Sequence, residues 1–127
     1  MIKDKNLKVP GYVTISKPRK DRIRGGVALL IREDIAFYPL TDVTYSAHDT
    51  YEGLFINVPQ SKDQDLIIGS MHRPPGQPLR SVNDDLAELI PVLTKDRRRV
   101  LLMGDFNINL MNLHSHEPTQ DFLNILT

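Results

Sequence analysis

The segment RRRVLLMGDFNINL, residues 97–110, decides the fold. Its residues 100–104 are apolar or small, and Asp105, Phe106 and Asn107 follow directly. A short apolar run of this kind is typical of a buried strand. We therefore expect a strand fixed in the protein interior, whose end presents a carboxylate and a carboxamide in the rigid position that catalysis requires.

The composition predicts one globular domain without a strong electrostatic preference. The 127 residues are 40% hydrophobic and 25% charged, and 16 basic residues balance 16 acidic ones. A global basic field of the kind that marks a nucleic-acid coat is therefore excluded. The sequence contains no cysteine, no apolar run of about 18 residues and no signal-peptide start. We expect an intracellular protein without disulfides, thiolate metal sites or membrane association.

Five other segments have the apolar, β-branched or aromatic character of strands. They are residues 11–16, 27–32, 35–40, 51–58 and 65–71, and glycine or proline bounds most of them. The segment VALLIR (27–32) is apolar enough to be a buried strand.

Two segments have helical periodicity instead. In the first, one face carries Leu86, Leu89, Ile90 and Leu93. Ser81 and Asp84 resemble a capping box, and we expect Pro91 to kink or shorten this helix. The second helix is predicted at 118–126, with Pro118 at its first position and with three inward residues, Phe122, Ile125 and Leu126.

The order of strand 65–71, helix and strand 97–104 predicts a crossover unit with parallel strands. Both strands would then end at one edge of the sheet, where ligands of such sheets bind. One strand ends in His72 and Arg73, and the other ends in Asp105 and Asn107. Because strand side chains alternate, Asp105 and Asn107 point to the same side. We expect these four residues to share one cleft.

Four motifs, RGGVALLIRED, GSMHRPPG, VLLMGDFNINL and DFLNIL, resemble the endonuclease/exonuclease/phosphatase superfamily. More narrowly, they are similar to the endonuclease domain of non-LTR (LINE-type) retrotransposons. The resemblance implies an α/β fold, part of a four-layer α/β/β/α sandwich (deoxyribonuclease-like) with mixed sheets. It also implies a Mg²⁺- or Mn²⁺-dependent phosphodiesterase that nicks DNA. Its partners would be DNA and the reverse transcriptase domain of the parent polyprotein, in the nucleus.

The resemblance assigns roles to the residues of the cleft. Asp105 would handle protons at the scissile phosphate and help to hold the attacking water, and Asn107 would orient that water or a phosphate oxygen. His72 stands where the family usually has a phosphate-contacting tyrosine. Since the charge of histidine changes near neutral pH, this departure predicts pH-sensitive activity. Arg73 is a candidate phosphate contact, with a carboxylate as the alternative partner. The metal ligands are not assigned.

Several family motifs are absent from the chain. The family has an upstream asparagine and a metal-binding glutamate, and it ends with an aspartate and a Ser-Asp-His motif. His114 and His116 cannot supply the histidine of that motif, because they follow GDFN too closely. We therefore expect residues 1–127 to be a single, incomplete domain, and whether this chain is an enzyme stays open. The alternatives are an inactive remnant or binding module of the same fold, or a phosphatase relative. An incomplete domain also predicts self-association through exposed strand edges.

The remaining polar clusters have competing interpretations. The basic segment 17–24 is either a solvated loop or a segment that follows a DNA backbone, and its basic residues are Lys17, Arg19, Lys20, Arg22 and Arg24. We expect Glu52 to be a solvated edge carboxylate rather than a metal ligand. The segment 95–99 is expected to be solvated at the end opposite the cleft, and HSHE (114–117) to be a loop rather than a zinc site.

Overall fold

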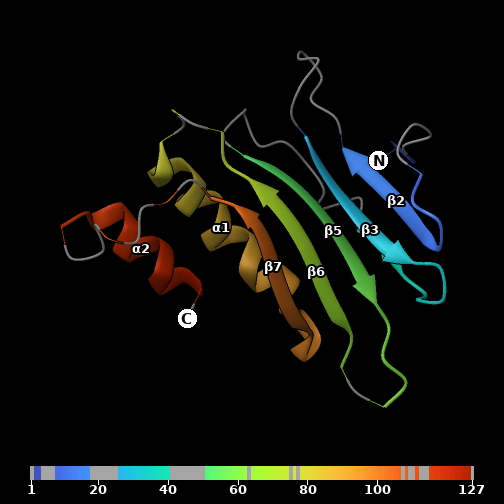
Figure 1. Ribbon diagram of the computed structural model, residues 1–127. Coiled ribbons are helices and arrows are strands. Elements are labelled where there is room, and N and C mark those ends of the chain that lie inside the picture. Colours follow the sequence, from blue (N-terminus) through green and yellow to red (C-terminus); the bar gives the residue numbers. More distant parts are fainter. Residues whose placement is uncertain are drawn as a thin grey trace.

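The computed structural model is a mixed α/β fold (Figure 1). It describes residues 2–3, 8–17, 26–40, 51–62, 64–74, 76, 78–106, 108, 111 and 115–126. These residues form two sheets, one of them mixed, and two α-helices. Among them, no helix is both long enough and apolar enough to cross a membrane.

The larger sheet has four strands in the order β4-β5-β6-β7. Its strands are β4 (Tyr38–Pro39), β5 (Glu52–Val58), β6 (Leu66–His72) and β7 (Arg99–Asp105). β5 runs antiparallel to β4 and β6, whereas β7 runs parallel to β6. The strand predicted at 35–40 is therefore confirmed only at Tyr38–Pro39, and the other strand predictions of this sheet hold within two residues at each end.

The smaller sheet is antiparallel, with the order β1-β2-β3. Its strands are β1 (Ile2–Lys3), β2 (Tyr12–Lys17) and β3 (Val27–Arg32). In β3, residues 27, 29 and 31 are buried and the alternate residues are exposed. The prediction of a buried strand at 27–32 is thus correct for one face only, since Leu30 lies on the other face and is 44% exposed.

Helix α1 (Leu79–Leu93) connects β6 to β7, which confirms the predicted crossover with parallel strands. The helix begins after Pro78 without a side-chain cap, so the capping box predicted at Ser81 and Asp84 is wrong. The helix starts upstream of Ser81 because its first residue, Leu79, is buried in the core. Pro91 lies inside the helix, which ends two residues later.

The core consists of two clusters, because alternate residues of β5 and β6 face opposite sides of the sheet. The first cluster lies between the larger sheet and the helices, and its most buried members are Tyr51, Phe55, Ile67, Met71, Val82, Leu86 and Leu93. The second cluster combines residues of both sheets, namely Ile15, Val27, Leu29, Ile31, Leu54, Ile56 and Val58. The two sheets therefore pack together on the side of the larger sheet away from the helices.

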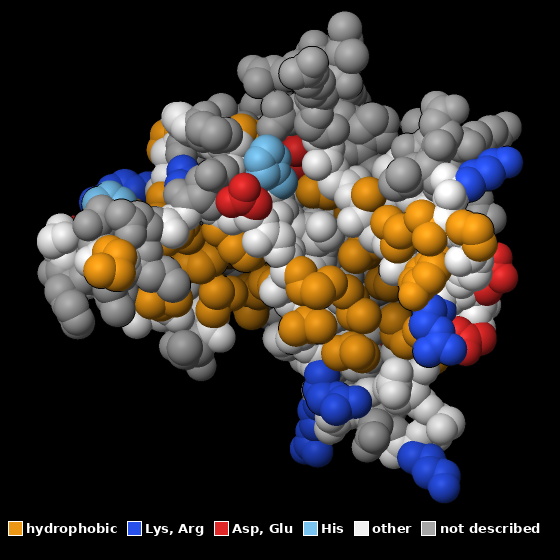
Figure 2. Space-filling view, viewed as in Figure 1, with side chains coloured by type: hydrophobic (Ala, Val, Ile, Leu, Met, Phe, Trp, Pro, Cys, Tyr) orange, Lys and Arg blue, Asp and Glu red, His pale blue; other side chains and the backbone are white. Residues whose placement is uncertain are grey.

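Strand β7 is not the interior strand that its apolar sequence predicts. It lies at the edge of the larger sheet, where β6 is its only strand neighbour among the described residues. Leu101 is 48% exposed and Met103 is 43% exposed. The helices cover one face of the sheet, and β3 packs against β5 and β6 on the other. The apolar residues of β7 on that second face therefore contribute to a broad hydrophobic surface (Figure 2).

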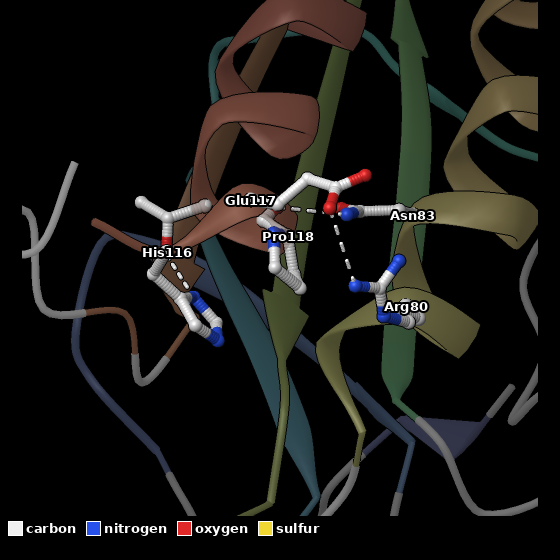
Figure 3. Close-up of polar contacts among 6 residues, drawn as sticks. Arg80, Asn83, His116, Glu117 and Pro118 are labelled. Carbon is white, nitrogen blue, oxygen red and sulfur yellow. Dashed lines mark hydrogen bonds and ion pairs between the residues drawn. The ribbon is translucent and has the colours of Figure 1, made fainter. Parts of the chain in front are cut away.

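Helix α2 (Glu117–Leu126) packs beside α1 (Figure 3). It begins one residue before Pro118, and Phe122 is buried as predicted, whereas Leu126 is exposed and its inward prediction is wrong. Nδ2 of Asn83, a buried residue of α1, donates a 2.9 Å hydrogen bond to the carbonyl oxygen of Pro118. This bond joins the second turn of α1 to the first turn of α2.

Two further predictions concern residues 95–99 and 114–117. Residues 95–99 are exposed apart from a half-buried Arg98, and they precede β7, at the opposite end from Asp105, as predicted. Arg98 donates hydrogen bonds to the carbonyl oxygen of Val92, in the last turn of α1, and to that of Lys95 beyond it. His116 contacts Thr119 Oγ1 through Nδ1 at 2.8 Å at the start of α2, which is a local helix-end contact. His114 lies outside the described residues.

Candidate functional site

Three ionisable side chains form a row across β5, β6 and β7. Glu52 pairs with His72 in the antiparallel register of β5 and β6, and His72 pairs with Asp105 in the parallel register of β6 and β7. Residues that pair directly in a sheet point to the same face. The predicted meeting of His72 and Asp105 at one sheet edge is therefore confirmed, while their catalytic roles stay predictions.

Glu52 is the residue of this row that sequence reasoning missed. It is 5% exposed, and its Oε2 lies 3.2 Å from Nδ1 of His72. The prediction of a solvated edge carboxylate is wrong because β5 is an interior strand of the sheet. A buried carboxylate requires a polar partner, and His72 supplies one. The signal in the sequence was a lone carboxylate within the apolar run 51–58, at the position that faces His72 across the connection from β5 to β6.

The end of β7 is held against β6 by close backbone contact. Gly104 has φ +145°, and a Cβ atom at this position would lie 1.8 Å from the carbonyl oxygen of Met71. No other residue type fits there without displacement of β7. Gly104 therefore brings the backbone of β7 onto β6 immediately before Asp105.

Arg73 ties the turn after β7 to the end of β6. Its backbone N–H donates to the carbonyl oxygen of Asp105 at 2.9 Å, and its Nε donates to the carbonyl oxygen of Phe106 at 2.7 Å. Arg73 was predicted as a phosphate contact with a carboxylate as the alternative partner, and the structure adds a third partner, the backbone. The residue holds the segment that presents Asp105, and contact with phosphate stays a prediction.

Asp105 and Phe106 point in opposite directions at the end of β7. Phe106 packs against the core beside α2, with its ring centroid 5.2 Å from that of Phe122 at an interplanar angle of 54°. Asp105 is exposed. The aromatic contact of Phe106 and the two bonds from Arg73 thus fix the backbone that directly follows the exposed carboxylate.

The surface around the site separates polar from apolar side chains. Histidine and acidic side chains gather toward the upper end of the face shown in Figure 2, and the hydrophobic surface begins below them. In Figure 1, β2 also ends on this upper side, as do β6 and β7. Lys17, the last residue of β2, therefore lies on the same side of the molecule as the row of ionisable residues.

Most of the predicted nucleic-acid contacts lie outside the described residues. These are Arg19, Lys20, Arg22 and Arg24, and Asn107 is outside as well. For Lys17, the structure describes the backbone only. The roles of these residues therefore stay predictions.

Among the described residues of the row, one exposed carboxylate could contribute to binding a divalent metal. Within the described parts of the chain, no three histidine or acidic residues lie close enough together to hold a metal ion. Glu52 is buried in contact with His72, whereas Asp105 is exposed. Mg²⁺ often binds through one or two carboxylates together with water and substrate phosphates. Asp105 fits that mode as one oxygen ligand, and no other ligand is assigned.

Comparison with known proteins does not identify a relative of this chain. No protein-family model matches the sequence, and no curated protein has significant similarity to it. The resemblance to the endonuclease/exonuclease/phosphatase superfamily therefore remains a prediction that depends on the motifs.

Proposed function

We propose that this chain is part of a metal-dependent phosphodiesterase that nicks DNA, within the four-layer α/β/β/α endonuclease domain of a retrotransposon polyprotein. The observation that carries the proposal is the register of β6 and β7, which aligns His72 with Asp105 at the carboxyl ends of two parallel strands. Ligands of α/β sheets bind outside these ends. The mixed sheet packed between helices and a second sheet is compatible with that architecture.

A phosphodiester resists attack by an anionic nucleophile because it is itself negatively charged. Asp105, exposed and fixed by its neighbours, orients the attacking water and accepts its hydrogen bond. His72 contacts the phosphate from the adjacent strand, and Asn107 orients the same water or a phosphate oxygen. A bound Mg²⁺ or Mn²⁺ would neutralise the phosphate charge, with Asp105 as one of its ligands.

The proposed partners follow from the same activity. DNA would lie across the upper side of the molecule, where Lys17 begins the basic segment. The reverse transcriptase domain of the same polyprotein would use the nicked strand, which places the activity in the nucleus. The exposed Leu101 and Met103 on edge strand β7 support self-association of the isolated chain.

Nicking of supercoiled plasmid tests the proposal. With Mg²⁺, a domain that includes residues 1–127 is expected to convert supercoiled DNA to the open circle, and EDTA or Asp105→Ala is expected to abolish the conversion. Asp84→Ala removes an exposed carboxylate from α1 and is the matched control, which should nick as the unchanged chain does. Far-UV circular dichroism establishes that each variant is folded.

The outcomes separate the proposed function from its alternatives. Nicking that persists in EDTA and in Asp105→Ala belongs to a contaminant and refutes the assignment. A folded chain that retards DNA without cutting it is the binding module of the same fold. Hydrolysis of a phosphomonoester without nicking identifies the phosphatase relative.

A further inference from the structure

We infer that Glu52 is a positioning residue, which holds His72 as the tautomer with hydrogen on Nδ1 and so makes Nε2 a hydrogen-bond acceptor. The contact of 3.2 Å between Glu52 Oε2 and His72 Nδ1 is the primary observation. An ionised carboxylate can only accept hydrogen bonds, so Nδ1 must be the donor. In the neutral imidazole, Nε2 then carries no hydrogen and can only accept.

The surroundings of the two side chains support this direction. The side chain of Glu52 is 7% exposed and that of His72 is 26% exposed, so the carboxylate is largely withdrawn from solvent while the ring is partly accessible. The two nitrogens lie on opposite sides of the ring. When Nδ1 faces Glu52 on β5, Nε2 faces away from β5, and the register neighbour of His72 on the other side is Asp105 on β7.

This assignment changes the chemistry that His72 brings to the proposed reaction. A neutral His72 with its hydrogen on Nδ1 cannot donate from Nε2 to a phosphate oxygen, as the family tyrosine does. It can accept a proton from water, which is the arrangement of a general base oriented by a third group. The O–H bond of water breaks and its proton passes to Nε2. The hydroxide forms the new bond to phosphorus, the bond to the departing oxygen breaks, and that oxygen takes a proton from solvent.

After the transfer, the imidazolium is held between two negatively charged groups. Glu52 remains bound to Nδ1–H, and Nε2–H now donates toward the phosphate. Buried carboxylates paired with histidine stabilise the imidazolium and fix its orientation in the same way in hydrolytic triads. This catalytic part of the inference rests on the proposed function, whereas the tautomer does not.

Nitrogen NMR of the imidazole rings tests the tautomer without DNA or metal. The chain labelled with ¹⁵N is measured at a pH that keeps the imidazoles neutral, and His72→Asn identifies the signals of His72 among the four histidines. The unchanged chain is expected to show hydrogen on Nδ1. Glu52→Ala is expected to shift the signals toward hydrogen on Nε2, the form that predominates in solvated histidine. Glu52→Gln keeps an acceptor oxygen and should largely retain the Nδ1 form.

The controls separate loss of position from loss of fold. Glu88→Ala removes an exposed carboxylate from α1 and should leave the His72 signals unchanged. Amide spectra of all variants establish that each is folded. Hydrogen on Nε2 in the unchanged chain overturns the inference, because it would mean that a protonated Glu52 donates to Nδ1. A Glu52→Ala spectrum identical to that of the unchanged chain overturns it as well.

A nicking measurement on the same variants separates this inference from the proposed function. If the chain nicks DNA, Glu52→Ala should lower the rate by up to about 100-fold, the lower end of what a general base contributes, and Glu52→Gln should recover part of it. The Nδ1 form without nicking refutes the proposed function and leaves the tautomer established. Nicking that is unaffected in a folded Glu52→Ala variant refutes the role of Glu52.

Discussion

Replacing Gly104 with alanine tests whether close approach of β7 to β6 holds the candidate site. A Cβ atom at Gly104 would lie 1.8 Å from the carbonyl oxygen of Met71, whereas contacts under 3.0 Å essentially never occur. The two strands would therefore have to separate by more than 1 Å, on the order of a third of a hydrogen-bond length. A separation of this size breaks the bond from the Arg73 N–H to Asp105, which now measures 2.9 Å.

The expected loss of stability has two parts. An alanine with positive φ costs about 1–2 kcal/mol by itself. The separation also breaks the two hydrogen bonds from Arg73 to the end of β7, which costs about 1 kcal/mol for each bond, and it loses some packing. We expect Gly104→Ala to lower the free energy of unfolding by about 3–5 kcal/mol, which is in the range of the most damaging single substitutions.

Gly11→Ala is the matched control for this measurement. Gly11 also has positive φ, +84°, but a Cβ atom there would meet nothing within 4 Å. Gly11→Ala should therefore lower the free energy of unfolding only by the cost of positive φ, about 1–2 kcal/mol. Urea denaturation followed by circular dichroism gives both values. Equal losses in the two variants would refute the argument, because the contact with Met71 would then contribute nothing.

Three further predictions concern other contacts. Asn83→Ala should lower the free energy of unfolding in urea by about 1–3 kcal/mol by removing the bond from α1 to α2, whereas Asp84→Ala should change it by less than about 0.5 kcal/mol. Arg73→Ala should lower the free energy of unfolding by about 1.5–3 kcal/mol and accelerate amide exchange at the end of β7. Unchanged exchange there would contradict the role of the Arg73 Nε. Leu101→Lys should reduce concentration-dependent association in sedimentation velocity, whereas Val92→Lys, which charges an equally exposed position on α1, should not.

The sequence predicted those features that depend on local periodicity. Strands β2, β3, β5, β6 and β7 were expected within a few residues of their observed bounds, because apolar runs bounded by glycine or proline carry a local signal. The crossover was expected from element order alone, and it brought His72 and Asp105 together across 33 residues of sequence.

The features that the sequence did not predict depend on which elements cover which face. Glu52 was expected to be solvated, but its burial depends on the neighbours of β5 in space. Residues 100–104 were expected in the interior, but β7 lies at the sheet edge, and β3 packs over β5 and β6. Hydrophobicity alone does not distinguish a covered face from an open one, since a folded protein exposes much apolar surface.

The alignment of Glu52 with His72 depends on the register of β5 and β6, and an aromatic ring explains how that register is fixed. Phe55 pairs with Gly69, where an added Cβ atom would lie 2.5 Å from the ring and 2.9 Å from Leu102. The ring therefore covers a position that only glycine leaves open. A slip of one residue would place a side chain under the ring and turn Glu52 to the opposite face of the sheet. The packing of Phe55 in the core thus determines, three residues away along β5, whether His72 meets a carboxylate.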